Sequence, residues 1–390
     1  MESTPHIYLV AGESSGDLLG GKLMMALKKI HPELTFSGLG GPKMGAQGLA
    51  PLFDFSELSL MGFAEVLPHI RKLKRRMAQV RDDIIAKQPE IVVTIDSPGF
   101  NFRLVKQLRE SGKVDNIKFL HYVAPTVWAY KPKRAEKVAT LFDKLLVLLP
   151  FEPPYFEREG LSTTFIGHPV LEDDYTRADG QAFREKHGIL PGAPLMLLLP
   201  GSRTTEIRRH LTIFQQTLEL LAARFGGLAE VIIVPKNMEH EIQEHLEDWP
   251  GHPIIVTEQD EKHDAFAAAT VALVKSGTIT LELACARVPM VVTYRVSAIT
   301  AWLLRRMIKV KYVSLVNLLL NREAIPELIQ EKCHPDKLAT KLSGFLSSNE
   351  MGDKQIEEAQ AALAQLIPES GQPPSQIAAK EVLKLALQKA

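Results

Sequence analysis

The sequence predicts an α/β protein with two domains, each built around a doubly wound parallel sheet. Its 390 residues exceed what one ordinary hydrophobic core accommodates. Short, strongly apolar runs alternate with helix-like patterns, as they do where parallel strands are covered by helices on both faces. The alternation pauses at the extended, proline-containing segment Gly167–Val170 and then starts again. We therefore place one domain at residues 1–168 and a second at 169–350, and expect the helices of 351–390 to cross back to the first domain.

The second domain begins with a candidate phosphate-binding turn. Leu195–Leu199 is an uninterrupted apolar run, typical of a strand buried on both faces. A Pro-Gly pair ends it, and Ser202 or Thr204 is placed to cap the helix that follows. A helix N-terminus attracts phosphate through its free N–H groups and its dipole, and Arg203 adds a guanidinium in the same turn. An ordinary βα turn with an exposed arginine fits the same residues equally well.

A second turn of the same kind favours the phosphate interpretation. After another predicted strand, Ser276, Gly277 and Thr278 again offer hydroxyls and N–H groups at a helix start. Glu282 follows one helical turn later on the same face. Two such turns on neighbouring strands favour a diphosphate between them. Further along, Asn317 interrupts an apolar run, which is typical both of a ligand and of a buried structural hydrogen-bonding group.

The first domain carries polar residues after its predicted strands. Asp96 directly follows the buried run Ile91–Ile95, at the strand end where open α/β sheets bind their ligands. A helix cap or a ligand of loop N–H groups is the alternative role for this carboxylate. His121 lies past the end of the next predicted strand.

Glycine-rich turns follow the first two predicted strands. Gly12 opens the first turn, Ser14 or Ser15 is placed to cap the next helix, and Gly16 lets that helix lie close to the sheet or to a ligand. Gly41 lies in the second glycine-rich loop, where backbone is free to approach a substrate. The spacing departs from GxGxxG, so a dinucleotide cofactor is not indicated.

Composition restricts the class of partner. The 46 basic and 46 acidic side chains give a formal net charge of zero, which argues against a general nucleic-acid binder. Cys285 and Cys333 lack metal-ligand spacing and suit a reducing cytoplasm better than a disulfide framework. We expect neither a secretory signal nor a membrane-spanning segment.

One stretch combines apolar residues with a basic cluster. The apolar residues are Met61, Phe63, Val66, Leu67 and Ile70, and the basic residues that follow include Arg71, Lys72, Lys74 and Arg75. A helix lying on an anionic bilayer has this signature, although a core-packed helix with a solvated basic end is the more frequent origin. We favour the membrane only for a protein whose substrate is a lipid. Trp302–Lys311 is a second stretch of this kind.

Ten sequence blocks together carry more information than any single turn. In chain order they are VAGESSGDLLG, GLGGPKM, MGFAEVL, IDSPGFN, HYVAPTVWAY, LPFE, FIGHP, LLPGSR, SGTITLE and YVSLVNLL. On these blocks the chain resembles the lipid-A-disaccharide synthases, bacterial glycosyltransferases of the GT-B fold, over nearly its whole length. The resemblance implies two Rossmann-like domains with the active site in the cleft between them.

The resemblance implies a specific reaction. A 2,3-diacylglucosamine unit passes from UDP to the 6′-hydroxyl of 2,3-diacylglucosamine 1-phosphate (lipid X), with inversion at the anomeric carbon. The products are a β-1′,6-linked disaccharide 1-phosphate and UDP. GT-B enzymes generally stabilise the leaving diphosphate without a bound metal, so no metal and no cofactor are expected here.

The resemblance also assigns roles in the first domain. Asp96 matches the family's essential aspartate and is predicted to be the base that takes the acceptor proton, with Glu13 and His121 as alternatives. The loops around Gly12 to Gly16 and around Gly41 are predicted to face the acceptor.

In the second domain the resemblance assigns the UDP-sugar. Ser202, Arg203 and the turn Ser276–Thr278 are predicted to stabilise the departing diphosphate. Glu282 suits the ribose hydroxyls, and Asn317 matches a family position near the nucleotide.

The resemblance further implies a place at the membrane. Family members are peripheral proteins on the cytoplasmic face of the inner membrane of Gram-negative bacteria. Because both sugars carry acyl chains, Met61–Arg76 becomes the favoured contact with anionic phospholipids, and Trp302–Lys311 the second. A homodimer with exchanged C-terminal parts is compatible with the family.

Two other classes of function remain open. A UDP-N-acetylglucosamine 2-epimerase, or another UDP-sugar transferase, shares the fold but needs no apolar and basic surface near Phe63. A lipid- or nucleotide-binding protein without enzymatic activity would lose nothing on Asp96→Asn.

Overall fold

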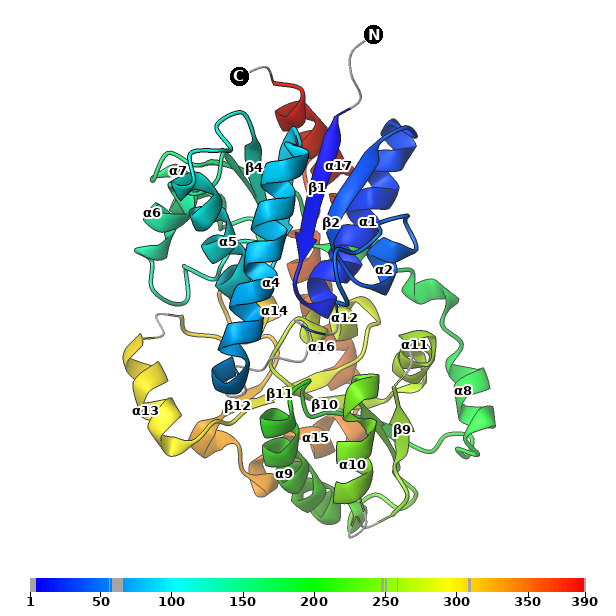
Figure 1. The fold of residues 1–390 in the computed structure, drawn as a ribbon. Coiled ribbons are helices and arrows are strands. Elements are labelled where there is room, and N and C mark those ends of the chain that lie inside the picture. Colours follow the sequence, from blue (N-terminus) through cyan, green and yellow to red (C-terminus); the bar gives the residue numbers. More distant parts are fainter. Residues whose placement is uncertain are drawn as a thin grey trace. The chain divides into compact units, whose positions relative to one another are not determined.

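The chain forms two compact units. The computed structural model describes residues 5–55, 57, 66–246, 249, 251–257, 259–307 and 310–388. The first unit comprises Met1–Glu172 and Leu366–Ala390, and the second comprises Asp173–Gln365 (Figure 1).

The segment that returns to the first unit is shorter than predicted. It starts at Leu366 rather than at residue 351. The reason is that α16 (Asn349–Ala364) packs on α12 (Ile279–Cys285) and α14 (Leu315–Leu320) of the second unit.

The first unit contains a six-stranded, entirely parallel sheet in the order β2-β1-β3-β4-β5-β6. Its strands are β1 (His6–Ala11), β2 (Thr35–Leu39), β3 (Ile91–Ile95), β4 (Lys118–Tyr122), β5 (Lys144–Val147) and β6 (Ser162–Phe165). All five residues of β3 are buried, because helices cover both faces of the sheet. The strand order reverses at β1 and β3, and such a switch point leaves a crevice outside the carboxyl ends of these two strands.

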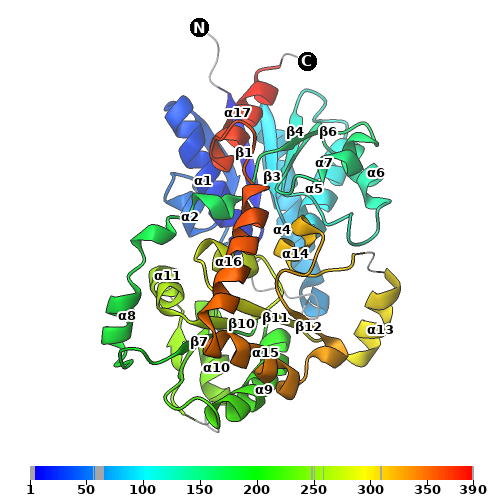
Figure 2. The same ribbon diagram turned by 180° about the vertical axis from the view of Figure 1, so that it is seen from behind.

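Helices cover both faces of this sheet. They are α1 (Ser14–Ile30), α2 (Pro42–Gly45), α4 (Val66–Lys87), α5 (Pro98–Glu110), α6 (Arg134–Ala139), α7 (Pro153–Glu157) and α17 (Pro374–Ala386). Successive side chains of β1 point to opposite faces. Leu9 packs with Leu23 of α1 and Val382 of α17, whereas Tyr8 packs with Val80 of α4 and with α5. Figure 2 shows α17 beside α1 on the face away from α4.

A buried carboxylate fixes the glycine-rich loop after β2. Asp17, which is 4% exposed, accepts hydrogen bonds from the N–H groups of Gly41, Lys43 and Met44 at 2.8, 2.9 and 3.0 Å. These bonds cap α2. A Cβ atom on Gly41 would lie 2.7 Å from Asp17 Oδ2, so the loop requires glycine at this position. Aspartate 17 thereby ties this loop to α1.

The second unit repeats the architecture with the sheet order β12-β11-β10-β7-β8-β9, again parallel throughout. Its strands are β7 (Leu195–Leu199), β8 (Ala229–Ile233), β9 (Ile254–Val256), β10 (Val271–Lys275), β11 (Met290–Tyr294) and β12 (Glu327–Ile329). Here the order reverses between β7 and β10. The predicted α/β class with two doubly wound parallel sheets is confirmed.

The helices of the second unit also lie on both faces of its sheet. Besides α12, α14 and α16 they are α8 (Gly180–Lys186), α9 (Thr204–Ala222), α10 (Glu239–His245), α11 (Gln259–Ala268), α13 (Ala298–Met307) and α15 (Pro335–Ser347). Met196 and Leu198 of β7 pack with Phe214 of α9 and Leu342 of α15 on one face. In the described part of the chain, no helix has the length and apolar character needed to cross a membrane.

Glu152, just before α7, is a carboxyl group buried in the first unit. It is 3% exposed and accepts hydrogen bonds from Trp128 Nε1 at 3.0 Å, from Leu148 N at 3.2 Å and from Leu149 N at 3.0 Å. Burial outweighs these donors and raises the pKa of Glu152 to about 7. The folded state therefore binds this proton more tightly than the unfolded chain does.

This shift predicts a pH dependence of stability that Glu152→Gln removes. Because the folded pKa is raised, the stabilising contribution of the proton is complete below the unfolded value near 4.5 and is lost as the pH rises towards 7. The loss amounts to about 3 kcal/mol at most. Urea unfolding of both proteins from pH 5 to pH 8 measures it. We expect the wild type to lose stability relative to Glu152→Gln; a constant difference across this range would contradict the assignment.

Candidate functional site

Two carboxylates lie at the switch point of the first unit. Glu13 follows β1 and Asp96 follows β3, and each has one oxygen engaged by a serine hydroxyl. Ser15 Oγ donates to Asp96 Oδ2 at 2.7 Å, and Ser97 Oγ donates to Glu13 Oε1 at 2.7 Å. The two bonds cross between the β1 and β3 loops, so each loop positions the carboxylate of the other. Glu13 is exposed and Asp96 is half-buried, and both keep a carboxylate oxygen for further hydrogen bonds.

The backbone that carries Asp96 is strained. Asp96 and Ser97 have φ angles of +51° and +47°, in the left-handed region that most L-residues avoid. The buried side chain of Asn101 holds this turn, because its Nδ2 donates to Asp96 O at 2.7 Å and to Ile95 O at 3.2 Å. Gly16 lets α1 approach the same turn, since a Cβ there would lie 3.2 Å from Ile95 O. Residues held in this way cluster at functional sites, where a fixed side-chain direction is needed.

The predicted serine cap of α1 is wrong. Glu13 occupies the N-cap position without a capping side-chain bond, and α1 begins at Ser14. Ser15 instead gives its hydroxyl hydrogen to Asp96. Gly12 is buried in this turn. In the glycine-rich loop after β2, the N–H of Gly41 already donates to Asp17, which positions that loop.

His121 does not fit the role of a base. It lies within β4 rather than past its end, and its side chain has no exposed surface. The ring lies between Phe102 and Phe142, with centroids 4.8 and 5.0 Å away, and Nδ1 is 2.7 Å from Thr94 Oγ1. Burial lowers the pKa of His121 to about 3. A neutral, enclosed imidazole has no access to a substrate proton, which leaves Asp96 and Glu13.

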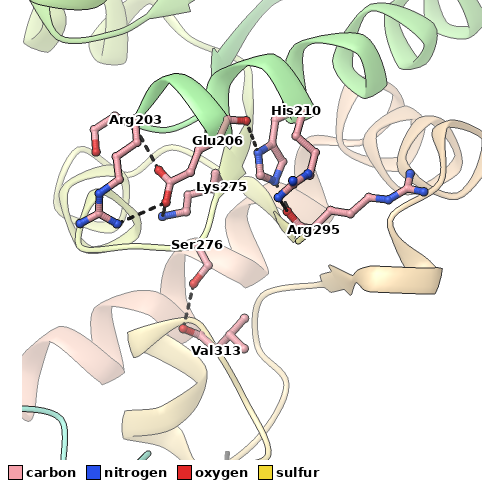
Figure 3. Close-up of polar contacts among 9 residues, drawn as sticks. Arg203, Glu206, His210, Lys275, Ser276, Arg295 and Val313 are labelled. Carbon is pink, nitrogen blue, oxygen red and sulfur yellow. Dashed lines mark hydrogen bonds and ion pairs between the residues drawn. The ribbon is translucent and has the colours of Figure 1, made fainter. Parts of the chain in front are cut away.

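In the second unit, the two predicted turns meet at the switch point between β7 and β10. Figure 3 shows Arg203 and Lys275 directed towards Glu206 of α9. Glu206 Oε1 lies 3.0 Å from Lys275 Nζ and 3.6 Å from Arg203 Nη1. Burial opposes ionisation of this carboxyl, but the cations prevail and the pKa of Glu206 is lowered. The Arg203 side chain is 69% exposed, so its guanidinium remains accessible to an anion.

The predicted serine or threonine cap of α9 is wrong, since no side chain caps this helix. Arg203, not Ser202 or Thr204, occupies the N-cap position, and the Glu206 carboxylate accepts a bond from Ser202 N at 3.4 Å. Gly201 has φ +126°, and a Cβ there would lie 2.7 Å from Glu206 Oε2. Lys275 and Glu206 are absent from the residues predicted for this site. The sequence signal that could have identified Lys275 is its position, because it ends a strand immediately before the predicted turn.

The Ser276–Thr278 turn offers fewer free donors than its sequence indicates. Ser276 N donates to Thr293 O at 2.9 Å and Ser276 Oγ donates to Val313 O at 3.0 Å, as Figure 3 shows for the hydroxyl. Both hydrogens of this serine are therefore engaged within the protein. Gly277 and Thr278 are exposed, and they are the residues of this turn available to an anion.

Asn317 is a structural residue rather than a ligand. It is fully buried, and Nδ2 donates to Ile325 O and Glu327 Oε1, both at 2.8 Å. Oδ1 accepts from Ala324 N and Ile325 N, also at 2.8 Å. Since these four bonds use the whole amide, no group remains for a nucleotide. Glu327 in turn accepts from Val313 N, so this network holds the loop before α14, whose Val313 carbonyl accepts the hydrogen bond from Ser276.

Glu282 lies on α12 and is paired with a cation. Lys262 Nζ of α11 is 2.6 Å from Glu282 Oε2, which leaves Oε1 for another donor. Lys262 is not among the residues predicted for this site from the sequence.

The predicted membrane contact is described in part. Met61 and Phe63 lie outside the described residues, and the side chains of Val66, Leu67 and Ile70 in α4 do as well. Arg71, Lys72, Lys74 and Arg75 are exposed. Lys72 and Arg76 pair with Glu57 at 3.2 and 2.5 Å, and chiefly the Arg76 bonds lower the pKa of Glu57 to about 2. In the second stretch, Trp302 of α13 is 55% exposed, with the Arg306 guanidinium 3.9 Å from its ring centroid.

Among the described residues, no group of three or more His, Cys, Asp or Glu side chains is arranged to hold a metal ion.

Solved structures share this fold. The UDP-GlcNAc 2-epimerase from Neisseria meningitidis bound to UDP-GlcNAc matches with a TM-score of 0.64 and 12% identity, over 97% of this chain and 100% of that one. A glycosyltransferase from Rickettsia africae ESF-5 matches with a TM-score of 0.60 and 13% identity, over 100% of each chain. At these identities the likeness establishes the GT-B-like fold alone.

Sequence relatives are far closer. The family model for lipid-A-disaccharide synthetase matches residues 7–382. The lipid-A-disaccharide synthase of Gluconobacter oxydans (strain 621H) is 46% identical over 379 residues, covering 97% of this chain and 90% of the relative. The lipid-A-disaccharide synthase of Rickettsia akari (strain Hartford) is 40% identical over 381 residues, covering 97% of this chain and 95% of the relative. The chain therefore belongs to the lipid-A-disaccharide synthetase family.

Proposed function

We propose that this enzyme forms the lipid A disaccharide by transferring 2,3-diacylglucosamine from UDP to the 6′-hydroxyl of 2,3-diacylglucosamine 1-phosphate, with inversion. The observation that carries the proposal is the Asp96 carboxylate, held by Ser15 at a sheet switch point in a chain of this family. No metal or cofactor takes part in the proposed reaction.

The first unit supplies the base in this proposal. The Asp96 carboxylate takes the proton of the acceptor hydroxyl, and the hydroxyl oxygen forms a bond to the anomeric carbon. The bond from that carbon to the diphosphate oxygen breaks, and its electron pair leaves on UDP. The hydroxyl of Ser15 and the strained turn support this role by fixing the direction of the carboxylate. Glu13 is the alternative base.

The second unit binds the donor in this proposal. Arg203, with the N–H groups of Gly277 and Thr278, stabilises the charge that develops on the diphosphate. Lys275 adds a second cation at the same switch point, 3.0 Å from Glu206. The free oxygen of Glu282, whose partner oxygen is held by Lys262, accepts from the ribose hydroxyls.

The proposed substrates are lipids, so we further propose peripheral binding to the inner membrane at its cytoplasmic face. Arg71, Lys74 and Arg75 are spaced three and four residues apart on α4, so they share one exposed face. Trp302 of α13, exposed and apolar, is the second contact. A homodimer remains a prediction.

Asp96→Asn tests the chemical step. With UDP-diacylglucosamine and lipid X, we expect UDP release to fall by about 10²–10⁴, the range for loss of a general base. UDP affinity, measured by calorimetry, should stay within about twofold because Asp96 does not bind the nucleotide. Glu13→Gln is the matched control that separates the two candidate bases. Full activity in Asp96→Asn would refute its role, and UDP release without lipid X would favour a hydrolase or an epimerase over a transferase.

Arg203→Ala tests stabilisation of the leaving group. We expect kcat to fall by about 10²–10³, as when a donor to a developing oxyanion is removed. Arg203→Lys should recover part of this loss, since an ammonium keeps the charge but not the planar fork. Arg224→Ala, which removes an exposed arginine elsewhere in the same unit, should leave kcat unchanged. Equal losses in both alanine variants would mean that overall charge, not Arg203, is responsible.

Replacing Arg71, Lys74 and Arg75 by glutamate tests the membrane contact. Each basic side chain near an anionic surface contributes about 1 kcal/mol, so the triple variant should bind phosphatidylglycerol vesicles at least 100-fold more weakly in a sedimentation assay. The control replaces Lys332, Lys337 and Lys341, which are exposed in the second unit, and makes the same change of net charge. If both triple variants lose equal affinity, the contact is not on α4.

A further inference from the structure

The first unit contains a cavity of about 620 Å³ that has no part in the proposed transfer site. It lies between α1, the single turn Pro169–Glu172 and the segment 367–376 that leads into α17. Asp96, Glu13 and their serine partners are not among its lining residues. Figure 2 shows the two helices that bound it, α1 and α17, side by side. Cavities of this size hold small ligands in many proteins.

Large apolar side chains line the opening of the cavity. Met25 of α1 is 47% exposed and Ile367 is 55% exposed, whereas Ala26 and Pro374, which also line the cavity, are buried. Apolar surface left open beside a concave space is stabilised when a ligand removes it from water. The apolar residues at the opening thus favour a ligand with a hydrocarbon part.

The charged residues around the cavity are mostly basic. Lys22 and Lys29 lie one helical turn before and after Met25 on the same face of α1. Lys380 is exposed next to the lining, since its Nζ donates to Oε1 of the lining residue Gln372 at 2.8 Å. Glu172 is the one acidic residue that lines the described cavity, and it is engaged within the protein: Oε1 accepts from Ser375 N at 2.5 Å and Oε2 lies 3.9 Å from Lys22 Nζ. The basic rim favours a ligand that also carries an anionic group.

We propose that this cavity binds a single-chain amphiphile with an anionic head. The hydrocarbon chain lies against Met25 and Ile367, and the head lies near Lys29 and Lys380. This is a lipid site in addition to the transfer site, and it does not depend on the identity of the transferred sugar. A protein partner fits less well, because a stable interface buries roughly 800 Å² on each partner. The exposed apolar surface here is confined to a few side chains around one cavity.

Calorimetry of the full chain with dodecyl phosphate, below its critical micelle concentration, tests the site. We expect one saturable site with a micromolar Kd, and at least tenfold weaker binding of the neutral dodecyl maltoside and of inorganic phosphate. Met25→Glu and Ile367→Glu should each weaken dodecyl phosphate at least tenfold, Lys29→Glu severalfold, and Met25→Leu little. The exposed controls Leu220→Glu and Lys341→Glu, both in the second unit, should bind as the wild type does. The α4 triple variant should also bind normally.

Three results of the binding titrations would overturn the proposal. They are the absence of saturable binding, equal affinity for the neutral and anionic amphiphiles, and equal loss in Met25→Glu and Leu220→Glu. A wild-type dimer that Met25→Glu converts to a monomer would also do so, because the surface would then bind a second copy. Transfer activity separates this proposal from the proposed function. Met25→Glu should keep UDP release within about twofold, and a parallel loss would mean that the cavity is part of the transfer site.

Discussion

Both sheets of this protein reverse their strand order once, and the two reversals place the carboxylates of the first unit and the cations of the second. Where two neighbouring parallel strands send their chains to opposite sides, no connection covers their carboxyl ends. In the first unit the uncovered ends belong to β1 and β3, and they present Glu13 and Asp96. In the second unit they belong to β7 and β10, and they present Arg203 and Lys275. One architectural rule thus yields an acidic site in one unit and a basic site in the other.

Hydrogen bonds between the loops then fix these groups. At the acidic site, Ser15 and Ser97 each donate a hydrogen bond to the carboxylate on the other loop, and Asn101 holds the left-handed turn at Asp96. At the basic site, Glu206 pairs with Arg203 and Lys275 and also accepts a hydrogen bond from Ser202 N. An anion that binds there meets cations that already have a carboxylate neighbour. Its affinity therefore reflects exchange of one anionic partner for another rather than attraction to bare charges.

Much of this arrangement is predictable from the sequence, because it depends on local patterns. A largely apolar run of five residues, followed by Asp96 or by a Pro-Gly turn and Arg203, identifies a strand end without knowledge of the fold. The partners of these residues are not predictable in this way. Lys275 of β10 pairs with Glu206 of α9, and Lys262 of α11 pairs with Glu282 of α12. The spacing of these residues in the sequence does not predict such contacts. His121 and Asn317 look reactive as residue types, yet full burial commits the imidazole to an aromatic cluster and the amide to four backbone and side-chain bonds.

The last helix of the chain, α17, has a consequence for the order of folding. Ala378, Val382 and Leu385 of α17 belong to the same core cluster as Leu9 of β1 and Leu23 of α1. On a ribosome, the first unit therefore lacks part of its hydrophobic core until α17 has been synthesised. The second unit, whose residues 173–365 are continuous, is complete before that moment. Domains synthesised first usually fold first. Here the second unit can be complete before the first, because the core of the first unit includes side chains of α17.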